Sequence, residues 1–129
     1  VIQKAENPKA IVIATGTEVD LAIKSIKLLK IPVTLVSMPC MELYDTQPFE
    51  YKRSLFPKGV PIISIEASCP YPWEKYSHQH LGVQTYGVSA PAPKVYEYFG
   101  LYPEKIAENI NHVVDFYKDR EVPDLLDRP

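Results

Sequence analysis

Cysteine is scarce in this sequence, and the two residues present form no metal or redox motif. Cys40 and Cys69 lie too far apart for the C-x-x-C spacing of zinc and thiol–disulfide sites. Reduced thiols in a cytosolic protein are the favoured interpretation, and a disulfide is the open alternative. A chain of 129 residues can bury a core without such staples, so we expect a single domain over residues 1–129.

Long apolar runs and an excess of basic residues are also lacking. The longest apolar run, Ala10–Ala14, is far too short to cross a bilayer, and no charged-then-apolar signal segment opens the sequence. The formal charge is -2, and acidic and basic residues are interspersed. We therefore expect neither a membrane nor a nucleic acid as a partner. The composition, 46% hydrophobic and 23% charged, is typical of a globular protein.

Apolar periodicity predicts an α/β fold with a parallel sheet. Apolar runs rich in β-branched residues are typical of strands that are covered on both faces, and segments with helical spacing separate these runs. The tail from 119 to 129 matches neither pattern. The predicted strands are Ala10–Ala14, Val33–Met38, Pro61–Glu66 and Gly82–Gly87, and the predicted helices cover 19–29, 48–55, 95–99 and 103–117.

Two strand-to-helix turns are candidate anion sites. Gly16 and Thr17 stand where backbone N–H groups and the helix dipole can hold a phosphate or carboxylate. A nucleotide loop needs more glycines than this turn has, and Glu18 would repel an anion, so helix capping by Thr17 is the simpler interpretation. Ser89, before a later predicted helix, completes this set. A regulatory module that binds a nucleotide or a phosphate is the corresponding hypothesis.

Two histidines and a cysteine are the other candidates for chemistry. His78 and His80 would face the same way in an extended segment, with Glu66 as the nearest third metal ligand. Two histidines do not make a zinc site, so a hydrogen-bonded structural or interface role is favoured. Cys69 with a histidine base has the residue types of a small hydrolase, but an inert thiol is favoured for this loop position.

Aromatic residues gather in the middle and later chain more densely than a core of this size needs. Because Tyr and Trp are enriched in interface cores, we expect part of them to form a docking surface. The candidate interface residues are Tyr71, Trp73, Tyr76, His78 and His80.

Several segments, in order and at matching spacing, resemble one family. The chain is similar to the C-terminal domain of transketolases, thiamine diphosphate enzymes that move a two-carbon ketol unit between sugar phosphates. The Tyr76–Gln79 run resembles the fungal branch, which includes the dihydroxyacetone synthases. The matching segments are Ala14–Val19, Val36–Pro39, Gln47–Tyr51, Trp73–Tyr76, Tyr86–Ala92 and Tyr98–Leu101.

The resemblance implies a small, mostly parallel (mixed) sheet of about five strands with helices on both faces. It also implies that thiamine diphosphate and Mg²⁺ (or Ca²⁺) are held by upstream domains of the same polypeptide, so this chain carries no catalytic, cofactor-binding or metal residue and is inactive alone. A structural role with a dimer contact is expected, in the cytoplasm, or in the peroxisome for a dihydroxyacetone synthase. The chain begins with Val1, which also favours a fragment of a longer protein.

Overall fold

A computed structural model describes residues 2–15, 18–38, 44–66, 76–82 and 102–126. The predicted helix at 95–99, both cysteines and residues 83–87 of the predicted fourth strand lie outside these residues. The described elements follow the chain in the order β1 (Ala10–Ala14), α1 (Glu18–Lys27), β2 (Val33–Ser37), α3 (Phe49–Leu55), β3 (Ile62–Glu66), β4 (Gln79–Gly82) and α5 (Pro103–Phe116).

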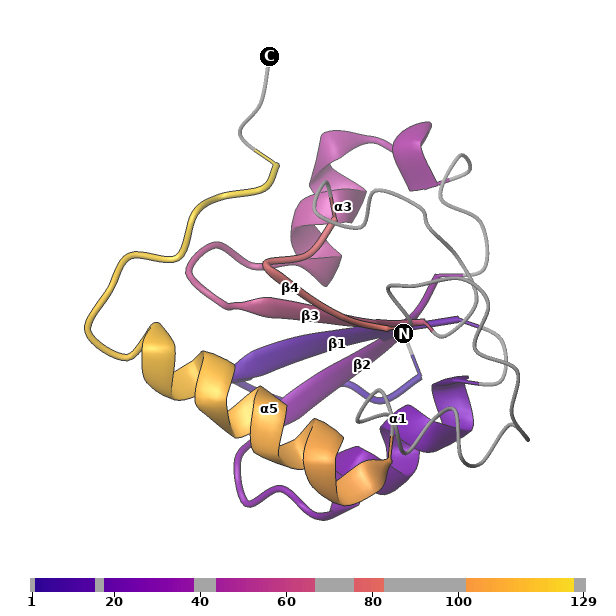
Figure 1. Ribbon diagram of the computed structural model, residues 1–129. Helices are drawn as coiled ribbons and strands as arrows, with labels where there is room; N and C mark the ends of the chain where they lie inside the picture. The colour runs from indigo at the N-terminus through magenta and orange to yellow at the C-terminus, as the bar shows by residue number, and fades with distance from the viewer. Residues whose placement is uncertain (1, 16–17, 39–43, 67–75, 83–101, 127–129) are drawn as a thin grey trace.

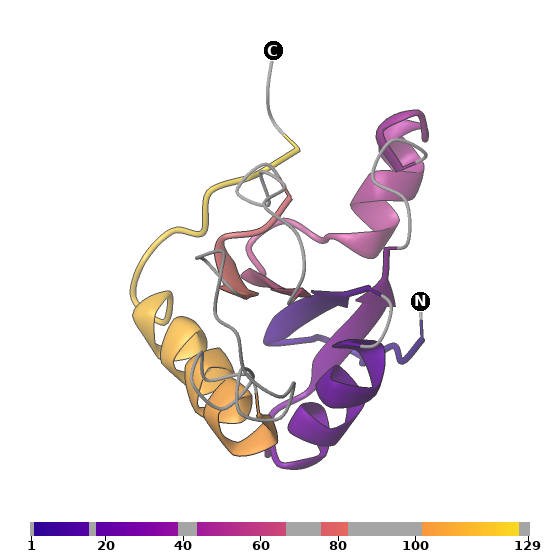
Figure 2. The same ribbon diagram turned by 45° about the vertical axis from the view of Figure 1, so that its right-hand side comes forward.

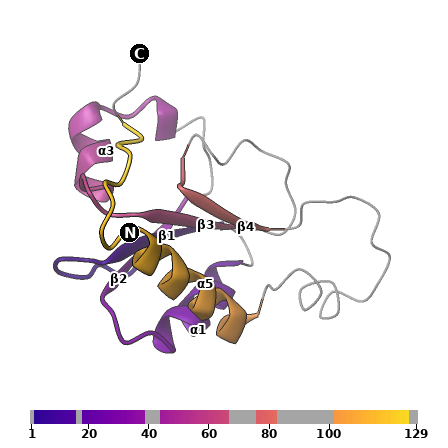
Figure 3. The ribbon, with the colours of Figure 1, turned by 60° about the vertical axis from the view of Figure 1, so that its left-hand side comes forward.

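The four described strands form one parallel sheet in the order β2-β1-β3-β4. Gln3, which belongs to none of these strands, forms an isolated antiparallel bridge with Leu35 of β2. The sheet is therefore mostly parallel and mixed, as expected. Helices α1 and α5 cover one face of the sheet and α3 lies over the other, as Figures 1 and 3 show. This arrangement confirms the expected α/β class with helices on both faces.

The alternation of side chains along the strands builds one apolar layer on each face. In β1, Val12 points toward α1 and α5, whereas Ile11 and Ile13 point toward α3. All five side chains of β1 are fully buried, which explains the continuous apolar run of this strand.

Helix boundaries agree closely with the apolar spacing. Pro103 occupies the first turn of α5, and Pro48 precedes α3, positions that tolerate a missing N–H. In α1 the acidic residues Glu18 and Asp20 lie in the first turn, and Lys24 and Lys27 lie in the last, which suits the helix dipole. No helix in the described ranges is long and apolar enough to span a membrane.

Two features differ from the sequence prediction. The fourth described strand covers Gln79–Gly82, so it begins before the predicted Gly82–Gly87. Residues 118–126, which we name the C-terminal strap, have a defined path where no structure was predicted. The strap leaves α5, passes the amino ends of the strands and reaches the α3 face, as Figures 1 and 2 show. Apolar side chains explain this path, because Leu125 and Leu126 pack against the layer under α3.

The central position of β3 predicts a large effect of truncating its core side chain. Ile63 is fully buried, and Ile63→Ala removes apolar contacts and leaves a cavity, so we expect a loss of about 3 kcal/mol in the free energy of unfolding. Urea denaturation followed by circular dichroism measures this loss. Leu28→Ala, at a side chain that is 52% exposed, is the control and should change stability by less than about 0.5 kcal/mol. Equal losses in the two variants would contradict the assigned core.

Candidate functional site

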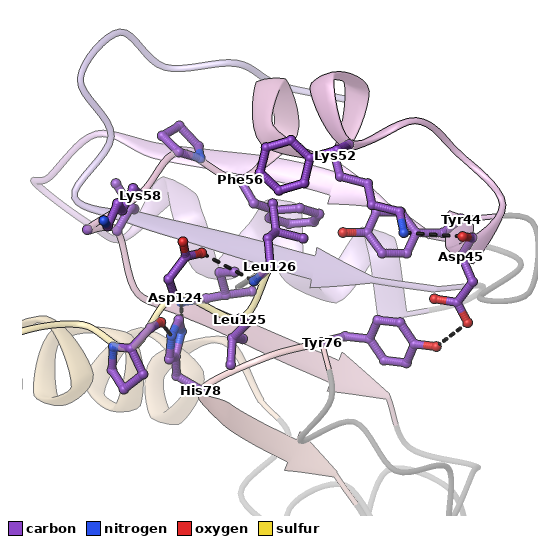
Figure 4. A pocket seen from close by; sticks show the side chains of 16 residues that line it. Tyr44, Asp45, Lys52, Phe56, Lys58, Tyr76, His78, Asp124, Leu125 and Leu126 are labelled. Atoms are coloured by element: carbon purple, nitrogen blue, oxygen red, sulfur yellow. Dashed lines mark hydrogen bonds between the residues drawn. The ribbon is translucent and has the colours of Figure 1, made fainter. Parts of the chain in front are cut away.

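A cavity of about 340 Å³ lies between α3, the turn before β3 and the C-terminal strap. It opens on the α3 face of the sheet, near the amino ends of β3 and β4. Figure 4 shows the side chains around it, which come from three stretches of the chain, within 44–62, 76–78 and 123–126. The lining residues are Tyr44, Asp45, Phe49, Lys52, Phe56, Pro57, Lys58, Gly59, Val60, Ile62, Tyr76, His78, Pro123, Asp124, Leu125 and Leu126.

Tyr44 is held in place by aromatic and cationic neighbours. Its ring meets Phe56 edge-on with centroids 5.8 Å apart and Tyr76 with centroids 5.9 Å apart. The Lys52 Nζ atom lies 5.1 Å from the Tyr44 ring centroid, within range of a cation–π contact. Burial, and secondarily the nearby Asp45 carboxylate, raise the pKa of Tyr44 to about 12. Its phenol therefore stays protonated at neutral pH and cannot serve as a base.

The two carboxylates of the cavity already have partners. Asp45 Oδ2 accepts a hydrogen bond of 2.8 Å from the Tyr76 hydroxyl. Asp124 Oδ2 pairs with Arg53 Nη2 at 2.7 Å, and Asp124 Oδ1 accepts from the Leu126 backbone N–H at 3.2 Å. The hydrogen bond from Arg53, with help from that backbone N–H, lowers the pKa of Asp124. Asp124 is therefore ionised at neutral pH and serves to anchor the strap, not to accept protons.

His78 connects the sheet to the strap through both of its ring nitrogens. Its Nδ1 accepts a hydrogen bond of 2.9 Å from the Ile62 N–H, so the proton of the neutral ring is on Nε2. That Nε2–H donates to the Pro123 carbonyl at 2.7 Å, and the ring meets Tyr117 edge-on at 5.7 Å. Burial lowers the pKa of His78, opposed by the bond to Pro123 and by the Asp124 charge. If Nδ1 were protonated, it would be a second donor facing the Ile62 N–H, and the hydrogen bond between these two atoms would be lost.

His80 belongs to a separate polar group on the same face of the sheet. Its Nδ1 lies 2.8 Å from the Ser64 Oγ, which lies 2.7 Å from the Ser77 Oγ. Ser64 and Ser77 are buried, so this group satisfies polar atoms inside the domain and offers no accessible nucleophile. Within the described residues, no three His, Cys, Asp or Glu side chains converge as metal ligands. His78 and His80 are therefore both engaged in hydrogen bonds within the chain, His78 with Ile62 and Pro123 and His80 with Ser64.

The remaining sequence candidates divide between residues that the structure describes and residues that it does not. Gly16, Thr17, Tyr71, Trp73 and Ser89 lie outside the described residues, as does Cys69. Along the chain, Gly16 and Thr17 follow the carboxyl end of β1, and Tyr71 and Trp73 follow that of β3. Of the five candidate interface residues, Tyr76, His78 and His80 are described. Tyr76 and His78 line the cavity.

Sequence reasoning missed most of this cavity. Tyr44, Lys52 and Asp124 are ordinary surface residues by sequence pattern, and Asp124 joins the other two around one cavity because the strap crosses to the α3 face. The usable signal was Leu125–Leu126, an apolar pair in an otherwise polar tail. The arrangement has the parts of a binding or structural site, since among the described residues no accessible nucleophile stands beside a free base.

A family profile described as the transketolase-like TK C-terminal domain matches residues 1–102. The chain belongs to the transketolase C-terminal domain family.

Relatives across fungi extend this match to nearly the whole chain. Transketolase 1 of Saccharomyces cerevisiae is 40% identical over 121 residues, which are 92% of this chain and 18% of that protein. Dihydroxyacetone synthase of Candida boidinii is 36% identical, covering 98% of this chain and 18% of that protein. A crystal structure of transketolase from Pichia stipitis superposes with a TM-score of 0.90 at 38% identity, covering 98% of this chain and 19% of that one. This transketolase C-terminal domain thus spans less than a fifth of the length of these relatives.

The His78 geometry predicts a pH-dependent stability. The folded-state pKa lies below the ordinary value of 6.5, so the unfolded state binds the proton more readily. The contribution of His78 to stability is present above pH 6.5, declines as the pH falls below that value, and is lost once the pH falls through the folded-state pKa. Urea denaturation between pH 7.5 and pH 5 should show this loss. His78→Gln should flatten the profile and cost about 1–3 kcal/mol at pH 7.5, because the Ile62 N–H loses its acceptor.

The control for this prediction is His112→Gln, since His112 is exposed on α5. This variant should keep the wild-type pH profile. An unchanged slope in His78→Gln would contradict the role assigned to the His78 ring.

The Arg53–Asp124 pair predicts local opening of the C-terminal strap when it is broken. Arg53→Met removes the partner of Asp124, whose side chain is only 16% exposed, so the strap should detach more often. Thermolysin should then cut before Val122, Leu125 or Leu126 several-fold faster, as measured by mass spectrometry. Lys105→Met breaks the exposed pair with Glu108 and is the matched control. Equal cleavage rates at the strap in both variants would contradict the anchoring role.

Proposed function

We propose that this chain is the C-terminal domain of a thiamine diphosphate-dependent transketolase that transfers a two-carbon ketol unit between sugar phosphates. The observation that carries this proposal is the match to full-length transketolases, at 40% identity to a yeast enzyme across 92% of this chain. The related Pichia stipitis transketolase has been crystallised with xylulose 5-phosphate and with sedoheptulose 7-phosphate, which supports sugar phosphates as the substrate class.

The cofactor belongs, in this proposal, to upstream domains of the same polypeptide. A divalent metal such as Mg²⁺ or Ca²⁺ requires converging oxygen ligands. The two carboxylates in the cavity, Asp45 and Asp124, are held by Tyr76 and Arg53, and the described residues contain no cluster of three metal-ligating side chains. In this proposal, as the family resemblance implies, the thiamine diphosphate and Mg²⁺ (or Ca²⁺) site and the catalytic steps belong to the upstream domains, and no metal ligand is assigned to the described residues.

The role proposed for the chain itself is structural, with a contact in the homodimer of the parent enzyme. Its exposed aromatic side chains support this role, because Phe49, Tyr51 and Phe116 are each about half exposed. Tyr71 and Trp73 remain candidate interface residues. The ring nitrogens of His78 and His80 bind within the chain, so we expect these two histidines to shape the interface by positioning its backbone.

Two alternatives remain as proposals. The parent could be a dihydroxyacetone synthase, which is supported by 36% identity to the Candida boidinii enzyme over 98% of this chain. The domain could also act as a regulatory module that binds a nucleotide or phosphate at Gly16, Thr17 and Ser89. We propose a cytoplasmic location for a transketolase and a peroxisomal one for a dihydroxyacetone synthase.

An activity assay on two proteins, the full-length parent and the isolated chain, tests the proposal. The full-length parent should convert xylulose 5-phosphate and ribose 5-phosphate in the presence of thiamine diphosphate and Mg²⁺. The isolated chain should show no turnover, because the cofactor site is assigned to other domains. Turnover by the isolated chain would refute the proposal. Trp73→Ala in the parent should shift the dimer toward monomer in analytical ultracentrifugation, whereas Leu28→Ala should not.

The acceptor separates the two parent enzymes. Replacing ribose 5-phosphate with formaldehyde should abolish turnover if the parent is a transketolase and sustain it if the parent is a dihydroxyacetone synthase. Binding of phosphate or ATP in calorimetric titrations of the parent, lost in Thr17→Val, would instead support the regulatory module.

A further inference from the structure

The cavity between α3 and the C-terminal strap has the size and wall of a small-ligand site. Its volume of about 340 Å³ lies in the range that holds a small organic molecule. One side is apolar and comes from Phe56, Ile62 and the strap residues Leu125 and Leu126. Such a wall favours a planar or branched apolar body, and it would leave the hydroxyl groups of a sugar without partners.

The carboxylates around the cavity accept hydrogen bonds from within the chain, whereas its ammonium groups keep donors that no described residue uses. Both carboxylates already accept hydrogen bonds, Asp45 from Tyr76 and Asp124 from Arg53 and the Leu126 N–H. The Lys52 ammonium donates one of its three hydrogens to the Asp45 backbone carbonyl at 3.2 Å. Lys58, on the rim, forms no ion pair within the described part of the chain. Among the charged side chains of the cavity, the unused hydrogen-bond donors therefore belong to Lys52 and Lys58.

Tyr44 adds a neutral donor at a fixed position. Its ring is braced by Phe56 and Tyr76, and in Figure 4 its hydroxyl end points toward the side of the cavity that Phe56 and Leu126 form. Among the described residues, this hydroxyl has no hydrogen-bond partner. The Lys52 ammonium lies over the same ring. A hydroxyl and an ammonium held on one ring suit the two oxygens of one carboxylate.

We propose that this cavity binds a small organic carboxylate with an aromatic or branched apolar body. The carboxylate meets Lys52 and the Tyr44 hydroxyl, and the apolar body packs against Phe56 and Leu126. The site uses no residue proposed for ketol transfer, so it is independent of the activity proposed above. A segment of the parent polypeptide that fills the cavity is the competing occupant.

Ligand-observed NMR on the full-length parent tests the site with benzoate as the probe. Benzoate should bind, and benzamide, its neutral isostere, should bind about tenfold more weakly because the charge pairs with Lys52. Inorganic phosphate at the same concentration should not displace benzoate, since it has no apolar body. Lys52→Met should weaken benzoate binding about tenfold, and Tyr44→Phe should weaken it about fivefold.

Lys105→Met on α5 is the matched control and should leave benzoate binding unchanged. The thermal midpoint and the turnover of the parent should be the same in all variants, which separates a lost site from a lost fold. Absence of benzoate binding to the parent would overturn the proposal, and binding to the isolated chain alone would assign the cavity to a covering segment. Equal affinity in Lys52→Met and wild type would also overturn it.

Discussion

The complete burial of β1 is the constraint on which the rest of this structure depends. A strand with five apolar side chains and no exposed face is stable only if both faces of its sheet are covered. On one face α1 and α5 supply this cover, with Ile106 and Ile110 of α5 fully buried. Among the helices whose bounds are given above, the other face has the short helix α3, none of whose residues is fully buried. Further segments must therefore complete that layer.

The C-terminal strap and Tyr44 complete the layer under α3. Leu125 and Leu126 bring apolar surface, but they arrive on a polar backbone that needs partners near the core. His78 supplies one such partner by binding the Pro123 carbonyl, and Arg53 adds an ion pair with the Asp124 side chain. Because irregular segments and side chains fill a layer less evenly than a helix does, a cavity remains between them. His78, Asp124 and Leu126, which hold the strap in place, thus also line the cavity.

The family relationship connects these features with much longer relatives. The chain belongs to the transketolase C-terminal domain family and spans less than a fifth of its matched relatives. In the described part of the chain, the buried hydroxyl groups of Ser64 and Ser77 and the carboxylate of Asp124 bind within the domain, which supports the structural role proposed above. The cavity differs from the rest of the described domain, because the ammonium groups of Lys52 and Lys58 keep hydrogen-bond donors that the cavity carboxylates do not accept.

Local pattern was sufficient for most of the fold. The apolar runs of β1, β2 and β3 and the spacing in α5 were read correctly, because strands buried on both faces and amphipathic helices have distinct periods. The strand β4 was placed too late, since Gln79 and His80 lack the apolar character of a buried strand. His80 is tolerated there because Ser64 on β3 satisfies its ring, a partner that no local rule predicts.

The cavity lay beyond local pattern for a similar reason. Tyr44, Lys52, His78 and Asp124 are distant in sequence, and each alone is typical of a solvated surface. The sequence by itself determined the fold class, the family and the apolar layers, because these depend on periodicity and on ordered motifs. Only the tertiary structure decided that the tail returns across the sheet to His78 and Arg53. That path depends on which buried polar atoms find partners once the layers have packed, and such pairing is not a property of any single segment.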